Sequence, residues 1–168
     1  MYKELSLTPP YQIRQAVTND ERNIRACLKA AFAPYRTEYT PEGFADTVLD
    51  SETIQRRLGE MRLFVAVSEG KIVGTIGCSV HGVEGHLRGM AVLPEWQGSG
   101  LASALLQTAE AELKRGGCTY ATLDTTEPLT RAIRFYERHG FSPSGRVSDF
   151  FGMRLYEYSK SLGTLGDS

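Results

Sequence analysis

The stretch "VLPEWQGSGLASALLQTAEAELKRGG", residues 92–117, combines a strand-like apolar end, a glycine turn and a helical pattern that stops at Gly116-Gly117. It follows the strand-like segment "HLRGMAV" at 86–92. A strand that leads into a helix favours a crossover to a parallel strand, and "TYATLDTT" at 119–126 has the composition of that strand. We therefore expect a strand–turn–helix–strand unit at the centre of the fold.

The segments on either side predict more antiparallel strands and further helices. Ile24, Cys27, Leu28 and Ala31 share one helical face. The other expected elements are a strand at 11–17, a helix from Asn19 or Asp20 to Pro34, one or two short helices within 35–60, a hairpin over 61–80 that turns at Glu69-Gly70, a helix within 127–141 stopped by Gly140, and one final strand at 148–159.

This order predicts an α/β fold, α+β in strict terms, with a mixed, mostly antiparallel central sheet and helices on both faces. Without repeats or linkers, residues 1–168 form a single expected domain, with a core at about 11–158 and a frayed tail at 159–168. The 41% hydrophobic content, 23% charged content and net charge of -1 leave no basic footprint for nucleic acid. We also expect no membrane association and no signal peptide. Three widely spaced cysteines suit reduced thiols, so we expect a cytoplasmic protein.

Two interpretations of the glycine turn stay open on physical grounds. The glycines either permit a tight turn, or they expose main-chain amides at a helix start, which is a binding site for phosphate groups. A dinucleotide fingerprint would need a third glycine where Ser103 stands, and the lysine-containing phosphate loop is absent.

Three segments together resemble the GNAT superfamily of acetyl-CoA-dependent N-acyltransferases. These are the strand before the turn, the "QGSGLA" motif at 97–102, which fits Q/R-x-x-G-x-G/A, and "AIRFYERHGF" at 132–141. The similarity extends from about Met61 to Phe141. One position departs from the family pattern, because Leu129 stands where an asparagine is common.

The resemblance implies the acyl-CoA fold, acetyl-CoA as acyl-donor cosubstrate, and N-acetyl transfer to a primary amine. It places the CoA pyrophosphate on main-chain amides and the pantetheine arm on the splayed strand. The implied donor-binding residues are Met90, Ala91, Val92, Gln97, Gly98, Ser99, Gly100, Leu101 and Ala102.

The resemblance also directs attention to acid and base groups. Tyr136 occupies the position of the family's general acid, since a phenol can protonate the leaving thiolate. His86 is the candidate base, six residues before Val92, where many relatives have a glutamate, and Glu84 is the second candidate. Strand alternation predicts that residues 86, 88, 90 and 92 share one face. His81, Glu84 and His86 lack a second ligand cluster, so no metal is expected.

The acceptor that the resemblance implies is a small-molecule or peptide amine, and its identity stays open. The aromatic segment 32–39 either lines its pocket or forms an exposed loop. Phe150 and Phe151 either pack internally or form an interface, which leaves a homodimer open. The alternative function is a catalytically degenerate acyl-CoA-binding regulatory module, an option that Leu129 and the missing strand glutamate leave open.

Overall fold

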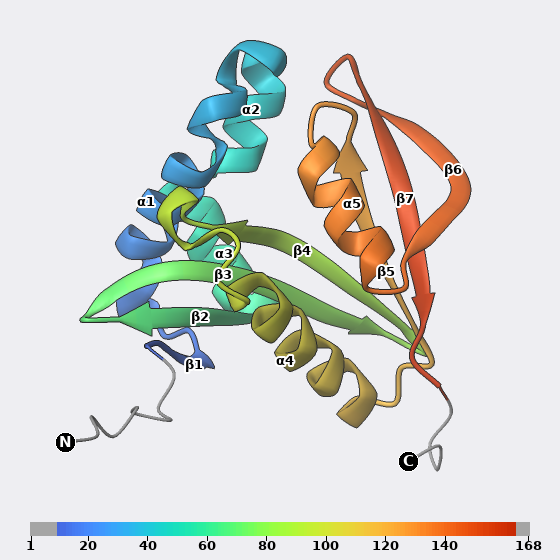
Figure 1. The fold of residues 1–168 in the computed structure, drawn as a ribbon, viewed down its shortest axis with the longest axis horizontal. Coiled ribbons are helices and arrows are strands. Elements are labelled where there is room, and N and C mark those ends of the chain that lie inside the picture. The colour runs from blue at the N-terminus through green and yellow to red at the C-terminus, as the bar shows by residue number, and fades with distance from the viewer. Residues whose placement is uncertain (1–9, 164–168) are drawn as a thin grey trace, which may run out of the picture.

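A seven-stranded sheet runs through the structure, a computed structural model that describes residues 10–163 (Figure 1). The strand order is β1-β2-β3-β4-β5-β7-β6, and every neighbouring pair is antiparallel except the parallel pair β4 and β5. The strands are β1 (Gln12–Gln15), β2 (Arg62–Ser68), β3 (Lys71–His81), β4 (Glu84–Val92), β5 (Tyr120–Thr126), β6 (Ser142–Phe150) and β7 (Met153–Ser161). The predicted mixed, mostly antiparallel sheet is confirmed.

In the described part of the chain, five α-helices cover the two faces of this sheet, and the predicted coverage of both faces is confirmed. They are α1 (Glu21–Phe32), α2 (Pro41–Val48), α3 (Ser51–Glu60), α4 (Leu101–Arg115) and α5 (Thr130–Arg138), with short 3-10 turns at Thr18–Asp20, Ala33–Glu38 and Pro94–Trp96. Helices α4 and α5 lie on one face and α1 to α3 on the other (Figure 1). Within residues 10–163, no helix combines the length and the apolar character needed to cross a membrane.

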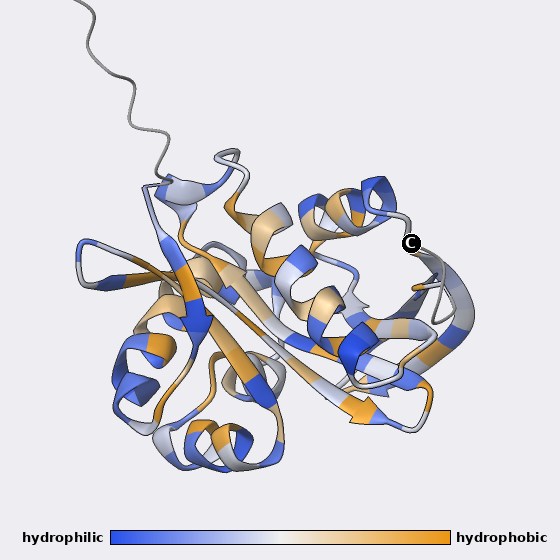
Figure 2. Ribbon diagram, turned by 90° about the horizontal axis from the view of Figure 1, so that it is seen from below, coloured by the Kyte–Doolittle hydropathy of each residue, from blue (hydrophilic) through white to orange (hydrophobic). Residues whose placement is uncertain are grey.

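The helices pack through the apolar faces that their periodicity predicts. In Figure 2 the helical ribbons carry both hydrophobic and hydrophilic residues, as amphipathic helices do. In α1 the buried residues are Ile24, Cys27, Leu28 and Ala31, which are the four residues of the predicted face. In α4 they are Leu101, Leu105, Leu106, Ala109 and Leu113. Each large apolar side chain that leaves water contributes about 1.5–3 kcal/mol. This burial holds α4 against β2, β3 and β4.

The C-terminal region differs from the sequence-based expectation of one strand at 148–159. The chain forms a hairpin instead, in which β6 turns through Phe151 and Gly152 into β7. Both turn residues have positive φ, 50° and 87°, as a two-residue hairpin turn requires. Phenylalanine rarely adopts that conformation, so the residue pattern gave little sign of the turn.

The chain is also ordered further than the predicted core boundary at residue 158. Strand β7 continues to Ser161, paired with Tyr120 of β5, and Leu162 is buried. The frayed tail predicted at 159–168 is therefore wrong at its start, and residues 164–168 lie outside the described part of the chain.

Candidate active site

Strands β4 and β5 separate part of the way along their length. Their parallel pairing runs from Glu84↔Tyr120 to Leu87↔Leu123, whereas the strands continue to Val92 and Thr126. Figure 1 shows the two strands diverging from their paired end. The far half of β4 therefore presents a main-chain edge toward β5 that no neighbouring strand of the described chain occupies.

A bulge at Gly89 changes which side chains β4 presents to each face. The pair Gly77↔Arg88 is followed by Thr75↔Ala91, so β4 carries one residue more than β3 between these positions. Gly89 has a φ of 65°, the left-handed conformation of a glycine bulge. The alternation of side chains along β4 is interrupted here.

The prediction that residues 86, 88, 90 and 92 share one face is therefore wrong beyond Arg88. His86, Arg88 and Ala91 lie on the face of α1 to α3, and Val92 lies on the face of α4. Met90 contacts α5. The bulge thus divides the predicted row between the two sides of the sheet.

The glycine turn before α4 has the conformation that only glycine adopts readily. Gly98 and Gly100 have φ values of 80° and 88°, and a Cβ built on either would meet no atom within 4 Å. Backbone conformation thus requires these glycines, and open space adjoins both of them. Such space at a helix start suits an anionic ligand.

The main-chain amides of this turn fall into two sets. Three donate to protein oxygens, namely those of Gln97, Ser99 and Leu101. Within the described chain, four have no protein acceptor, namely those of Gly98, Gly100, Ala102 and Ser103. Free donors at the positive end of the α4 dipole favour negative charge, and these four amides lie within the predicted run 97–102 except that of Ser103, which directly follows it.

A cavity of about 720 Å³ joins this turn to the gap between the strands. Met90, Ala91, Val92, Gln97, Gly98, Gly100 and Ala102 line it, as do His86 and Tyr136. Ser99 and Leu101, also predicted to bind the donor, lie outside the lining, and Leu101 is fully buried in the core. Most of the predicted donor-binding and catalytic residues therefore line one continuous cavity.

His86 lies in a polar array at the point where β4 and β5 separate. Its Nδ1 atom is 2.9 Å from Thr122 Oγ1, and that hydroxyl donates to Glu84 Oε1 at 3.1 Å. Because the hydroxyl has a single proton, Nδ1 carries a proton and donates it to Thr122. The Nε2 atom is then left as the basic nitrogen of the neutral ring.

The basic nitrogen of His86 faces a carboxylate that the sequence analysis did not nominate. Asp124 Oδ2 lies 3.6 Å from Nε2, and both residues line the cavity. Burial lowers the pKa of His86 below its usual value, and the Asp124 charge partly opposes that shift. Burial also raises the pKa of Asp124. The imidazole is therefore neutral at pH 7, and the nearby Asp124 carboxylate would stabilise its protonated form.

Glu84, the second candidate base, does not reach the cavity. Its carboxylate accepts the hydrogen bond from Thr122, and the residue is absent from the cavity lining. In the structure it orients the Thr122 hydroxyl, which in turn orients His86.

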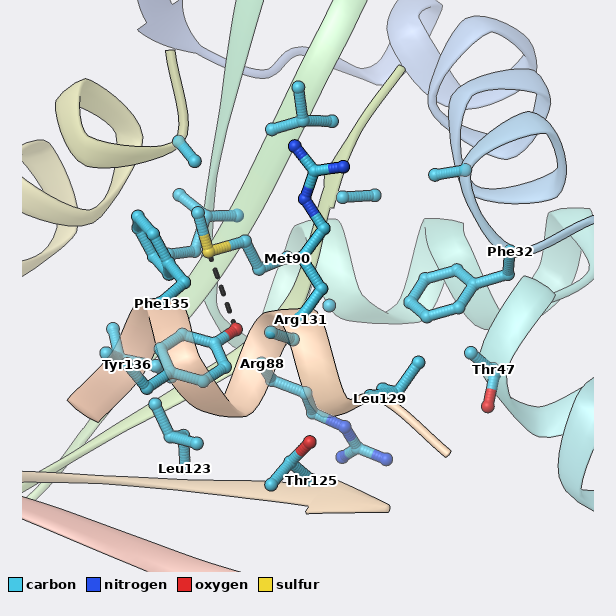
Figure 3. A pocket seen from close by; sticks show the side chains of 18 of the residues that line it. Phe32, Thr47, Arg88, Met90, Leu123, Thr125, Leu129, Arg131, Phe135 and Tyr136 are labelled. Carbon is cyan, nitrogen blue, oxygen red and sulfur yellow. Dashed lines mark hydrogen bonds between the residues drawn. The ribbon is translucent and has the colours of Figure 1, made fainter. Parts of the chain in front are cut away.

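Tyr136 approaches the cavity from α5, on the other side of β4. Its hydroxyl donates to the Met90 sulfur at 3.5 Å, the contact drawn in Figure 3. The ring packs edge-on against Phe135 and Phe141. Burial raises the pKa of the Tyr136 hydroxyl, so the phenol keeps its proton at neutral pH. This is the state that a proton donor requires.

The aromatic segment before α2 forms the wall opposite α5. Phe32, Tyr35 and Tyr39 line the cavity, and the Tyr39 hydroxyl is 2.6 Å from Thr126 Oγ1 at the end of β5. Of the two expectations for this segment, the pocket lining is the one observed. Phe150 also lines the cavity, whereas Phe151 is exposed.

Cationic side chains of the lining were missed by the sequence analysis. Arg57 of α3, Arg88 of β4, and Arg131 and Arg138 of α5 line the cavity. Arg88 and Arg131 are among the side chains in Figure 3. Isolated arginines on amphipathic elements look like solvated surface residues in a sequence, so only the fold shows that they converge.

Known proteins share this architecture. Ribosomal-protein-S18-alanine N-acetyltransferase from Escherichia coli has a TM-score of 0.76 at 20% identity, covering 94% of this chain and 97% of its own. PaiA N-acetyltransferase from Thermoplasma acidophilum, in complex with coenzyme A, has a TM-score of 0.76 at 17% identity, covering 90% and 98%. At these identities the likeness establishes the fold.

The family follows from the sequence itself. The sequence model of the Acetyltransferase (GNAT) family matches residues 24–141, from α1 through the glycine turn to the end of α5. The chain therefore belongs to the GNAT acetyltransferase family and is an acyltransferase that uses acetyl-CoA as its acyl donor.

Proposed function

We propose that this enzyme transfers the acetyl group of acetyl-CoA directly to a primary amine of a small molecule or peptide, with His86 as general base and Tyr136 as general acid. The observation that carries the proposal is that both side chains line one cavity, His86 from β4 and Tyr136 from α5. Base and acid then act on opposite sides of the same reacting carbonyl.

The base is needed because a primary amine is mostly protonated at neutral pH. An amine with a pKa of ~10.4 is neutral in about one molecule in 2,500 at pH 7, a penalty of roughly 4.6 kcal/mol. The neutral His86 ring accepts the amine proton at Nε2, directly or through one water, and Asp124 stabilises the resulting imidazolium.

The acid completes the proton balance. The amine nitrogen forms a bond to the carbonyl carbon, the carbon–sulfur bond breaks, and the Tyr136 hydroxyl gives its proton to the CoA thiolate. The Tyr136 hydroxyl already donates to a sulfur atom, that of Met90, so its direction suits a sulfur leaving group. Main-chain amides on the free edge of β4 stabilise the charge that develops on the carbonyl oxygen.

The residues of the glycine turn fit the phosphates of the donor. The free amides of Gly98, Gly100, Ala102 and Ser103 can donate hydrogen bonds to phosphate oxygens. A lysine side chain is not needed for this binding. Each such charge-assisted hydrogen bond contributes about 1.5–3 kcal/mol. Leu129 lines the cavity but has no polar group, so any cofactor contact that an asparagine would make at this position is lost or supplied by another residue.

The test is an acceptor screen with acetyl-CoA in which free thiol is measured. The panel includes small amines, amino acids, polyamines and peptides that begin with alanine, the residue named for the Escherichia coli neighbour. Thiol release that depends on the amine, with a matching acetylated product by mass spectrometry, supports the proposal.

Calorimetry with acetyl-CoA distinguishes a regulatory module that binds acetyl-CoA without transferring the acetyl group from a protein that does not bind acetyl-CoA. Tight binding without transfer to any amine would instead favour a regulatory acyl-CoA-binding module, and an absence of binding would rule out both functions.

A further inference from the structure

Two arginines from different elements line the cavity on the side of the sheet that α1 to α3 cover. Arg57 comes from α3, and Arg88 comes from β4, two residues after His86. A Cβ built on Gly89 of the bulge would lie 3.5 Å from Arg57 Nη1, so the Arg57 guanidinium reaches the main chain next to Arg88. Both arginines also line a second, very small cavity beside the bulge.

Neither guanidinium has an acidic partner in the described chain. Arg14, Arg62, Arg115 and Arg146 each pair with a carboxylate, but no carboxylate of residues 10–163 lies within 4.0 Å of Arg57 or Arg88. Nor does either side chain donate a hydrogen bond within those residues. The fold itself leaves their donors unused.

This arrangement is electrostatically unfavourable in the absence of a ligand. Burial, followed by the Arg88 charge, lowers the pKa of Arg57 to about 10, and Asp46 only partly compensates. A half-buried cation beside a second cation lowers stability unless an anion accompanies it. Strongly perturbed groups in a cleft are candidates for ligand recognition.

The position of the pair separates it from the donor phosphates. The free amides of the glycine turn lie at the start of α4, whereas Arg88 shares its face of β4 with His86, on the side of α1 to α3. Two residues along a strand correspond to about 7 Å. An anion held by Arg88 therefore lies close to an amine at His86, within one small molecule or one peptide end.

We propose that the acceptor amine carries an anionic group, a carboxylate or a phosphate, which Arg57 and Arg88 bind. This inference rests on the proposed function, because it assigns the acceptor to the cavity beside His86. The planar guanidinium fork suits both oxyanions, since each offers two oxygens to parallel N–H donors. Asp124 and His86 then face the amine end of a zwitterionic acceptor.

The experiment compares matched acceptors that differ in the anion alone. The pairs are α-amino acids and their methyl esters, and phosphoethanolamine and ethanolamine. Binding to the enzyme loaded with CoA is measured by calorimetry, which requires no turnover. KM is then measured with acetyl-CoA, and the two pairs distinguish a carboxylate from a phosphate.

The variants are Arg57→Gln and Arg88→Gln, with Arg56→Gln as the matched control. Arg56 is adjacent to Arg57 on α3, but it is exposed and outside the cavity lining. We expect either cavity variant to raise Kd and KM for the charged acceptors by about 10- to 100-fold, the loss of one charge-assisted hydrogen bond. Binding of neutral acceptors and of acetyl-CoA should change far less than binding of the charged acceptors, and Arg56→Gln should match the wild type.

Two results would overturn the inference. One is equal binding of the charged and neutral members of each pair, and the other is unchanged binding of the charged members in Arg57→Gln and Arg88→Gln. The proposed function fails separately: arginine-dependent binding without thiol release removes the transferase assignment but keeps anion recognition. Acetylation with the same KM for charged and neutral amines would keep the transferase assignment and remove anion recognition.

Discussion

The Nε2 atom of His86 and the Oδ2 atom of Asp124 lie 3.6 Å apart, across the point where strands β4 and β5 separate. His86 pairs in register with Thr122, so Asp124 is the next residue of β5 on the same face. The carboxylate raises the pKa of a ring whose pKa burial lowers. The basicity of the proposed base thus depends on how these two strands part.

Replacement of Asp124 by asparagine should lower the pKa of His86 further. The substitution removes the charge that opposes desolvation and keeps the size of the side chain. Titration of the His86 ring protons by NMR measures the effect, and Glu127→Gln, an exposed carboxylate outside the cavity lining, is the control. An unchanged or raised pKa of His86 in Asp124→Asn would show that the two groups are not coupled.

Replacement of Tyr136 by phenylalanine should slow acetyl transfer by about 100-fold or more, because the thiolate then leaves without a proton donor. Acetyl-CoA affinity, measured by calorimetry, should be unchanged, since the ring contacts with Phe135 and Phe141 remain. Tyr120→Phe, on an exposed tyrosine of β5, is the control and should keep the wild-type rate. A Tyr136→Phe enzyme as fast as the wild type would remove Tyr136 from the mechanism.

Replacement of Gly100 by alanine should weaken acetyl-CoA binding by about 10-fold and destabilise the fold by about 1 kcal/mol. The residue has a φ of 88°, where a Cβ is strained, and the new methyl group enters the open space beside the free amides.

The matched control for Gly100→Ala is Gly59→Ala in α3. Gly59 has ordinary helical geometry and no neighbour within 4 Å of its built Cβ. This change should leave acetyl-CoA binding intact and stabilise the protein by about 0.5–1 kcal/mol. Equal binding by both variants, measured by calorimetry, would argue against a pyrophosphate site at Gly100.

Replacement of Asp20 by alanine should destabilise the protein by about 1–3 kcal/mol at pH 7, because the main-chain amide of Val17 loses its acceptor. The hydrogen bonds from Arg14 hold the pKa of Asp20 below its usual value. A depressed carboxyl pKa gives stability that is present above the pKa of the unfolded chain and is lost as the pH falls through the folded-state pKa.

Urea unfolding of wild type and Asp20→Ala at pH 7 and in acid tests this dependence. The difference between the two proteins should shrink in acid. Arg14→Gln, at an exposed partner, should cost less than Asp20→Ala at pH 7. A difference between wild type and Asp20→Ala that is independent of pH would contradict the proposed role of the carboxylate.

Local patterns predicted most of the fold. The buried face of α1, the helix start at Thr40-Pro41, the turn at Glu69-Gly70 and the end of α4 at Gly116 all agree with the structure. Each depends on interactions between residues close in the chain, such as capping or the exclusion of side chains from positive φ. The β6–β7 hairpin was missed because its turn begins with phenylalanine, a residue that seldom adopts the required φ.

Predictions about the site were less complete. The sequence nominated His86, Tyr136 and the glycine turn, and the structure places all three around one cavity. It did not nominate Asp124 or Arg57, which lie on other elements and follow no motif. Strand alternation also failed beyond Gly89, because the extra residue of a bulge reverses the facing of every side chain after it.

The sequence by itself determined most of the element types, the glycine turn that requires positive φ, and the three segments that identify the family. These are properties of short stretches, set by backbone sterics and the period of apolar residues. Only the tertiary structure decided which charges meet. The parting of β4 from β5 places a carboxylate against His86, and the packing of α3 on the bulge places Arg57 beside Arg88. Electrostatic interactions depend on distance in space and on burial, and separation along the chain specifies neither.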